Sequence, residues 1–161
     1  NASPGFVLGG GLRDCLAGNT RSIVVEITEH EPIDDYASLR AAISALGPSV
    51  RVAVDDAGAG IANFDHIVEL RPDFVKLDVS LIRGIDEDLT RQALVGGLRN
   101  FAHSLGKFVI AEGIETAAEA ATLRSLRVRL GQGYFLGRPG PAAGMAHGDP
   151  ETSIRSLHAA S

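Results

Sequence analysis

The segment Val52-Ala53-Val54-Asp55-Asp56-Ala57-Gly58-Ala59-Gly60 decides how this sequence is interpreted. Small apolar residues lead directly into two adjacent carboxylates, and glycines follow. A short apolar run that ends at a turn signal is typical of a buried parallel strand. Two ionised aspartates side by side repel each other, and a divalent cation shared at the carboxyl end of the strand would relieve that repulsion. The alternative is that Asp55 and Asp56 begin a solvated turn, where one of them caps the next helix.

Composition limits the classes of protein to which the chain can belong. Its 161 residues are 45% hydrophobic, which predicts one soluble domain with an apolar core. The single cysteine, Cys15, excludes a disulfide framework and fits a reducing, cytoplasmic compartment. The net charge of -5 argues against a DNA partner, and we expect no membrane segment because no apolar run approaches spanning length. The five histidines are scattered, so we expect no histidine metal site.

Strand and helix patterns alternate along the chain. We expect a weak helix in 6–16, because glycines interrupt it, and a helical turn near 154–158 in the small polar tail. A further strand is possible at the extreme start. The remaining strands are predicted at 22–27, 50–55, 74–78, 107–112 and 128–136, and the remaining helices at 32–46, 61–70, 89–105 and 116–126.

This repetition predicts an α/β fold built of barrel-type units. Right-handed crossovers would make the strands parallel and place their carboxyl ends on one face. An open doubly wound sheet is the alternative, but no glycine-rich phosphate loop follows a strand. The expected face collects polar side chains from successive strands: Glu26, Asp55, Asp56, Lys76, Asp78, Glu112 and Gln132.

Six short motifs occur in order along the chain. They are Asn1-Ala2-Ser3, Glu26-Ile27-Thr28-Glu29, Asp55-Asp56-Ala57-Gly58-Ala59-Gly60, Lys76-Leu77-Asp78, Glu112-Gly113-Ile114-Glu115 and Gly131-Gln132-Gly133-Tyr134-Phe135-Leu136-Gly137-Arg138-Pro139. In this order and at this spacing, the motifs resemble those of the EAL-domain family of bacterial cyclic di-GMP phosphodiesterases. One such motif would be weak support, whereas six in order are specific.

The resemblance implies a (β/α)8 TIM-type barrel, here incomplete. About six β/α units, strands three to eight of the barrel, would occupy residues 1–141, and residues 142–161 would form a C-terminal tail. The first two strands and the Glu-Ala-Leu signature, whose glutamate binds metal in the family, are absent from this sequence. A barrel without two strands leaves open edges, so we expect the chain either to form a homodimer through them or to be part of a longer protein. We also expect linkage to sensor or cyclase domains in the full-length protein.

The resemblance also implies hydrolysis of cyclic di-GMP to linear pGpG with two magnesium or manganese ions, in second-messenger signalling. Lys76 resembles the lysine that holds the attacking water and the phosphate, and Gln132 the glutamine beside that water. Glu112 resembles both a metal ligand and a candidate base. Glu29 and Glu115 resemble supporting residues next to the ligands. The metal ligands by resemblance are Asn1, Glu26 and Asp55 for the first ion, and Asp55, Asp56 and Glu112 for the second.

The loop after the two aspartates departs from the family pattern Asp-Asp-Phe-Gly-Thr-Gly-Tyr-Ser-Ser-Leu. Ala57 and Ala59 replace the phenylalanine and the threonine, while both glycines are retained. Loss of an aromatic ring and a hydroxyl should weaken the packing and hydrogen bonding of the loop. The altered loop and the absent signature favour an alternative function, a degenerate EAL domain that binds cyclic di-GMP as a receptor without cleaving it. A third alternative, a scaffold that only dimerises, would not need the acidic residues at the strand ends and ranks last.

Overall fold

The computed structural model describes residues 1–27, 33–57, 62–138 and 155–157. The chain divides into two compact units, residues 1–74 and residues 75–161. Within the described ranges, no helix is long and apolar enough to cross a membrane.

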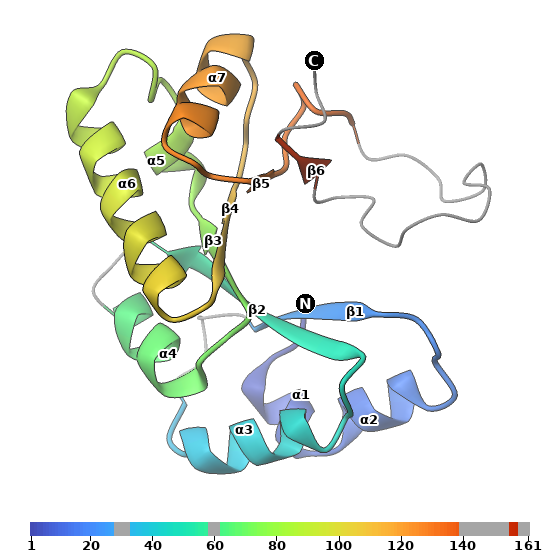
Figure 1. Ribbon diagram of the computed structural model, residues 1–161. Coiled ribbons are helices and arrows are strands. Elements are labelled where there is room, and N and C mark those ends of the chain that lie inside the picture. The colour runs from blue at the N-terminus through green and yellow to red at the C-terminus, as the bar shows by residue number, and fades with distance from the viewer. Residues whose placement is uncertain (28–32, 58–61, 139–154, 158–161) are drawn as a thin grey trace. The chain divides into compact units, whose positions relative to one another are not determined.

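The first unit contains a parallel pair of strands, β1 (Ile23–Ile27) and β2 (Val50–Ala57), which are connected in sequence by helix α3 (Tyr36–Ser44) (Figure 1). The strands pair from Ile23 opposite Val50 to Ile27 opposite Val54. Ala2 adds an isolated parallel bridge to Ile27, at the extreme start where a further strand was possible. The elements of this unit are α1 (Pro4–Leu8), α2 (Gly11–Leu16), β1 (Ile23–Ile27), α3 (Tyr36–Ser44), β2 (Val50–Ala57) and α4 (Ala62–Leu70).

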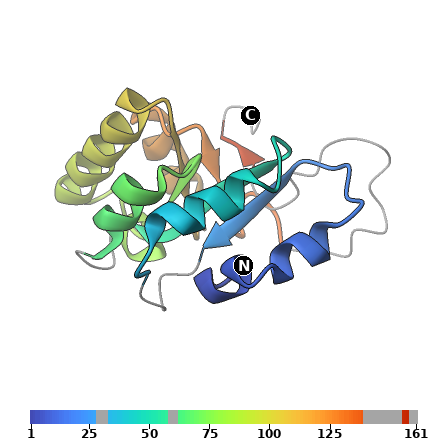
Figure 2. The same ribbon diagram turned by 90° about the horizontal axis from the view of Figure 1, so that it is seen from below.

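One side of the β1–β2 pair forms the core of the first unit. Val25, Ile27, Val52 and Val54 are all buried and alternate along the two strands, so they share one side of the sheet. Helix α4 contacts β2 and α3, and α1 contacts α2 and α3, as can be followed in Figures 1 and 2. The helices therefore supply the apolar partners that the buried strand residues require.

Two helices in this unit differ from their predicted limits for local reasons. The helix expected over 6–16 is divided into α1 and α2, because Gly10 takes a left-handed conformation with φ of 82°. Helix α3 begins at Tyr36, where the Asp35 carboxylate accepts a hydrogen bond from the Ser38 amide at 3.0 Å. The start predicted at residue 32 lies outside the described residues.

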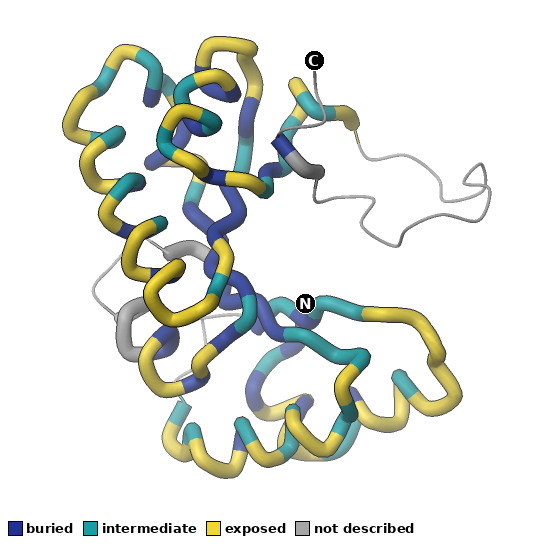
Figure 3. The backbone as a smooth tube through the Cα atoms, in the orientation of Figure 1, coloured by how far each residue is buried: buried dark blue, intermediate teal, exposed yellow. Residues whose placement is uncertain are grey.

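The second unit contains the long helix α6 (Leu89–Ser104) and the strands β3 (Phe74–Leu77), β4 (Phe108–Ala111), β5 (Leu130–Gly131) and β6 (Arg155–Ser156), which lie in this order in the sheet. Strands β4 and β5 are parallel, with Ile110 opposite Leu130, and β5 and β6 are antiparallel. Figure 3 shows dark blue, buried backbone along β3 and β4, whereas much of α6 is exposed. The elements are β3 (Phe74–Leu77, which begins at the end of the first unit), α5 (Val79–Ile82), α6 (Leu89–Ser104), β4 (Phe108–Ala111), α7 (Ala117–Ser125), β5 (Leu130–Gly131) and β6 (Arg155–Ser156).

The predicted helical turn near 154–158 is wrong. Arg155 and Ser156 form β6, which pairs with β5. Leu157 is fully buried, and its amide donates to the carbonyl of Arg129 at 2.8 Å. Backbone pairing with a strand edge and the burial of one leucine outweigh the weak helical preference of a short polar segment.

Helix α5 was not predicted, and β5 is shorter than the strand expected over 128–136. Asp78, expected as the last residue of a strand, instead caps α5 and accepts from the Ser80 amide at 2.9 Å. Beyond β5, the amide of Phe135 donates to the carbonyl of Ile114 at 3.0 Å, so the chain turns there rather than continuing the ladder.

Candidate functional site

A buried ion pair joins the ends of two neighbouring strands in the second unit. The Lys76 Nζ atom, on β3, lies 2.6 Å from the Oε1 atom of Glu112, the residue that follows β4. The Lys76 side chain is 4% exposed and that of Glu112 is 16% exposed. A charge removed from water requires a partner, and here each side chain supplies one for the other.

Gln132 completes a group of three residues around one carboxylate oxygen. Its side-chain amide donates to the same Glu112 Oε1 atom at 2.6 Å. The register places it there: Ala111 pairs with Gly131, and the Gln132 amide donates to the Ala111 carbonyl at 2.9 Å. The structure thus brings together Lys76, Glu112 and Gln132, the three residues predicted to be catalytic.

Gly133 allows the chain to pass close to the segment after β4. A Cβ atom at this position would lie 2.2 Å from the Ile114 carbonyl oxygen, closer than any side chain tolerates. The Ile114 amide also donates to the Gln132 carbonyl at 3.1 Å. Only glycine fits this approach, which fixes Gln132 beside Glu112.

The first unit carries its own set of predicted site residues. Glu26 on β1 pairs with Ala53 on β2, and Asp55 lies two residues beyond Ala53. Because side chains alternate along strands, Glu26 and Asp55 lie on the same side of the pair, opposite to the apolar side. Asn1 is exposed and precedes Ala2, whose amide donates to the Glu26 carbonyl at 2.9 Å.

The predicted metal ligands are oxygen donors of the kind that Mg²⁺ and Mn²⁺ prefer, so the residue types fit such ions. Among the described side chains, no group of three or more His, Cys, Asp or Glu residues lies close enough to hold a metal ion. Asp56 belongs to β2, but its side chain is not among those described, and Glu29 lies outside the described residues. The ligand set therefore remains a prediction.

Glu115 joins two segments that follow neighbouring strands. Its Oε1 atom lies 2.6 Å from Arg83 Nη2, and the two side chains are 40% and 53% exposed. Arg83 follows α5, whereas Glu115 follows Glu112 along the chain. Solvent weakens such a pair, so it contributes little to the free energy of folding.

Glu119 is a residue whose full role the sequence did not reveal. The Thr116–Glu119 capping box was predicted and is confirmed, with Thr116 Oγ1 accepting from the Glu119 amide at 3.1 Å. The Glu119 side chain is also buried and bound to a distant segment. Burial opposes ionisation, but hydrogen bonds from the Gly84, Glu115 and Thr116 amides and the nearby Arg83 charge outweigh it and lower the pKa of Glu119.

A family model, curated relatives and solved structures all match this chain to one family of proteins. The EAL domain family matches residues 12–139. The chain is 32% identical over 124 residues to the probable cyclic di-GMP phosphodiesterase PdeA of Escherichia coli K12, which covers 76% of this chain and 17% of PdeA. It spans about a quarter or less of the length of the curated relatives that it matches first.

Several solved structures have folds similar to the fold of this chain. An EAL domain protein from Listeria monocytogenes has a TM-score of 0.77 and 26% identity, covering 89% of this chain and 60% of that one. Klebsiella pneumoniae BlrP1, in a complex with manganese and cyclic di-GMP, has a TM-score of 0.71 and 33% identity, covering 84% of this chain and 37% of BlrP1. The chain therefore belongs to the EAL-domain family, and its α/β fold is part of the TIM-type barrel of that family.

Proposed function

We propose that this chain hydrolyses cyclic di-GMP to linear pGpG, using a pair of divalent cations. The observation that carries the proposal is the group around Glu112 Oε1, which lies 2.6 Å from both Lys76 Nζ and Gln132 Nε2. A buried ammonium, a carboxylate and an amide donor in contact form a suitable site for a phosphate and a water molecule. The name of PdeA and the manganese and cyclic di-GMP complex of BlrP1 support the same substrate class.

In this proposal, each of the three residues acts through the atom that the structure presents. The Lys76 ammonium attracts a phosphate oxygen and neutralises charge that develops during the reaction. Glu112 accepts a proton from the attacking water, whose oxygen bonds to phosphorus as the bond from phosphorus to the ribose 3′ oxygen breaks. The released 3′ oxygen takes a proton from solvent and becomes the 3′ hydroxyl of pGpG. Gln132 holds the Glu112 carboxylate in place through its amide.

The proposed metal ligands are the acids and the amide named in the sequence analysis. When bound, the ions would neutralise the phosphate and lower the pKa of a water molecule. Asn1, Glu26, Asp55 and Asp56 would hold them together with Glu112, which then serves as a ligand as well as a proton acceptor. Glu26 and Asp55, on the same side of the β1–β2 pair, support this assignment.

A second candidate function is binding of cyclic di-GMP without cleavage. Ala57 and Ala59, in place of an aromatic residue and a hydroxyl residue, favour it because they weaken the loop after the aspartates. For either function, we propose a cytoplasmic setting, a homodimer and linkage to sensor or cyclase domains. These proposals rest on the family resemblance.

Two measurements separate the two functions. The first is chromatographic detection of pGpG after incubation of the chain with cyclic di-GMP and Mn²⁺, repeated with a chelator. The second is calorimetric titration of cyclic di-GMP into the chain in the presence of Ca²⁺. We expect Mn²⁺-dependent pGpG. Binding without product in any metal would instead establish a receptor, and neither binding nor product would refute both functions.

A further inference from the structure

We infer that Glu119 is a positioning residue for the site, because its buried carboxylate joins the segment that follows Lys76 to the segment that follows Glu112. This inference rests on the proposed function for its catalytic consequence. Its structural part, a link between two segments, stands on contacts within the second unit alone.

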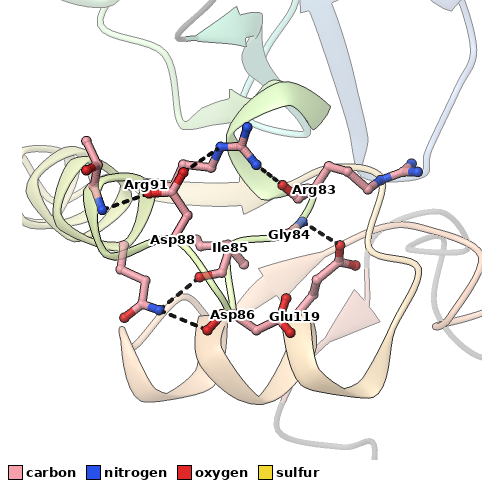
Figure 4. A network of polar contacts seen from close by, with 9 residues as sticks. Arg83, Gly84, Ile85, Asp86, Asp88, Arg91 and Glu119 are labelled. Atoms are coloured by element: carbon pink, nitrogen blue, oxygen red, sulfur yellow. Dashed lines mark hydrogen bonds and ion pairs between the residues drawn. The ribbon is translucent and has the colours of Figure 1, made fainter.

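The two carboxylate oxygens of Glu119 bind different parts of the chain. Oε1 accepts from the Gly84 amide at 3.0 Å, as Figure 4 shows. Oε2 accepts from the amides of Glu115 at 2.8 Å and Thr116 at 3.1 Å. One side chain, 2% exposed, therefore holds two segments separated by about thirty positions in the sequence.

The first of these segments is firmly connected to Lys76. From Lys76 the chain passes through Leu77 and the Asp78 cap into α5, and Gly84 lies two residues after that helix. Leu77, Ile82 and Ile85 are completely buried, so this stretch is packed into the core. Displacement of Gly84 is therefore transmitted toward the end of β3, where Lys76 is located.

The same turn is also held from its other side by α6. Gln92 donates its side-chain amide to the Ile85 carbonyl at 2.9 Å, and Arg91 donates to the Arg83 carbonyl (Figure 4). Asp88 caps α6 by accepting from the Thr90 amide at 2.9 Å. With α6 on one side and Glu119 on the other, the turn has a defined position.

The second segment is tied to Glu112 over a shorter path. Glu115 lies three residues after Glu112, and Ile114 between them is completely buried. Gly113 has φ of 66°, and a Cβ atom there would lie 2.4 Å from Val79 Cγ2 at the start of α5. The two segments thus touch at Gly113 and Val79, and Glu119 fastens them a few residues further on.

The exposed Arg83–Glu115 pair bridges the same two segments, but it does not replace Glu119. Both of its side chains are more than a third exposed, and water and salt weaken such pairs. The Glu119 carboxylate is buried and satisfied by three amide donors, which is the arrangement in which a hydrogen bond is costly to lose. The buried link is therefore expected to set the separation of the segments.

The test uses two substitutions of Glu119 and one of Thr116, which together separate this link from the helix cap. Glu119→Gln retains one carbonyl oxygen, which can serve either Gly84 or the Glu115 and Thr116 amides but not both sets. Thr116→Ala removes the hydroxyl that caps α7 and leaves the Glu119 carboxylate intact. Glu119→Ala serves as a more severe variant of the same position. Thermal melting establishes that each variant is folded before the other measurements.

The first readout is amide hydrogen exchange by NMR, without metal or substrate. In Glu119→Gln we expect faster exchange at Gly84 and at Glu112, whose amide donates to the Leu77 carbonyl at 3.2 Å. In Thr116→Ala we expect faster exchange only in the first turn of α7. Unchanged exchange at Glu112 in both variants at position 119 would overturn the inference, whether or not the chain has phosphodiesterase activity.

The second readout is steady-state hydrolysis of cyclic di-GMP with Mn²⁺. Loss of a supporting contact to reacting groups lowers activity by roughly 10- to 100-fold in comparable sites. We expect a decrease of that order in kcat for Glu119→Gln with KM changed less than about twofold, and wild-type kcat for Thr116→Ala. Equal kcat in Glu119→Gln and Thr116→Ala would show that Glu119 only caps α7. If the wild-type chain has no activity, the proposed function fails while the exchange result still decides the structural link.

Discussion

The ammonium of Lys76 and the carboxylate of Glu112 lie 2.6 Å apart at the ends of β3 and β4, and the lysine is almost completely buried. The contact joins two strands whose backbones also meet there, through the Glu112 amide and the Leu77 carbonyl. It is both a structural bond and the centre of the proposed reaction. Substitutions at these positions should therefore affect stability and activity together.

Replacing one member of this pair should destabilise the chain. Lys76→Met leaves the Glu112 carboxylate without its buried counter-charge, and such a loss costs about 3–5 kcal/mol in the free energy of unfolding. The double variant Lys76→Met with Glu112→Leu should be less destabilised than the single one. Urea denaturation measures both. A single variant as stable as the wild type would show that the ion pair does not contribute to folding.

Substitution of Gln132 should lower catalytic activity more than it lowers the free energy of unfolding. Gln132→Leu removes the amide that donates to Glu112 and keeps a side chain of similar size, so kcat should fall roughly 10- to 100-fold. Gln92→Leu, in the first turn of α6, makes the same substitution at a residue whose side-chain amide donates to the Ile85 carbonyl, and it also tests whether the turn before α6 affects the site. A Gln132→Leu enzyme with wild-type kcat would remove this residue from the mechanism.

Ionisation of Glu119 should make the free energy of unfolding depend on pH in the acidic range. Its pKa in the folded chain lies below its usual value, so its ionised form stabilises the fold. That contribution is complete above the unfolded pKa of about 4.3 and is lost as the pH falls through the lower, folded pKa. Urea denaturation should therefore find Glu119→Gln less stable than the wild type at pH 7, with a smaller difference near pH 3. For Thr116→Ala, which removes an uncharged group, the difference from the wild type should not change with pH.

The C-terminal strand should contribute to the core. Leu157 is completely buried beside β5, and Leu→Ala at such sites costs about 2–5 kcal/mol in unfolding free energy. Leu94→Ala on α6 is the matched control, because that leucine is 47% exposed and should cost far less. Equal stability of the two variants would contradict the packing of β6 against β5.

The sequence was most informative where local chemistry and tertiary structure agree. The apolar runs predict the strands, and the strand ends place Lys76, Glu112 and Gln132 on one expected face. Their catalytic roles are implied by the resemblance to the EAL-domain family. The capping box at Thr116 was likewise visible, because it depends on residues three positions apart. These features are fixed by short-range patterns.

The features that could not be predicted depend on partners distant in sequence. Arg155 and Ser156 form a strand because they pair with the edge of β5, and the next residue, Leu157, is buried in the core. The sequence of this short segment alone indicates neither partner. The bond from Glu119 to the Gly84 amide joins residues 35 positions apart, and the capping motif gave no sign of it. The sequence predicts Asp78 as the last residue of a strand. Its role as the N-cap of α5 depends on that helix, which the sequence pattern does not predict.

The most direct test of the proposed reaction compares two variants in one assay. Wild type, Glu112→Gln and Glu87→Gln are incubated with cyclic di-GMP and Mn²⁺, and pGpG is quantified by chromatography. Glu87 is exposed in the turn before α6 and provides the same chemical change away from the group around Glu112. We predict pGpG from the wild type and Glu87→Gln, and a decrease of at least about 100-fold for Glu112→Gln. Equal product from Glu112→Gln and the wild type would contradict the assignment of the reaction to this site.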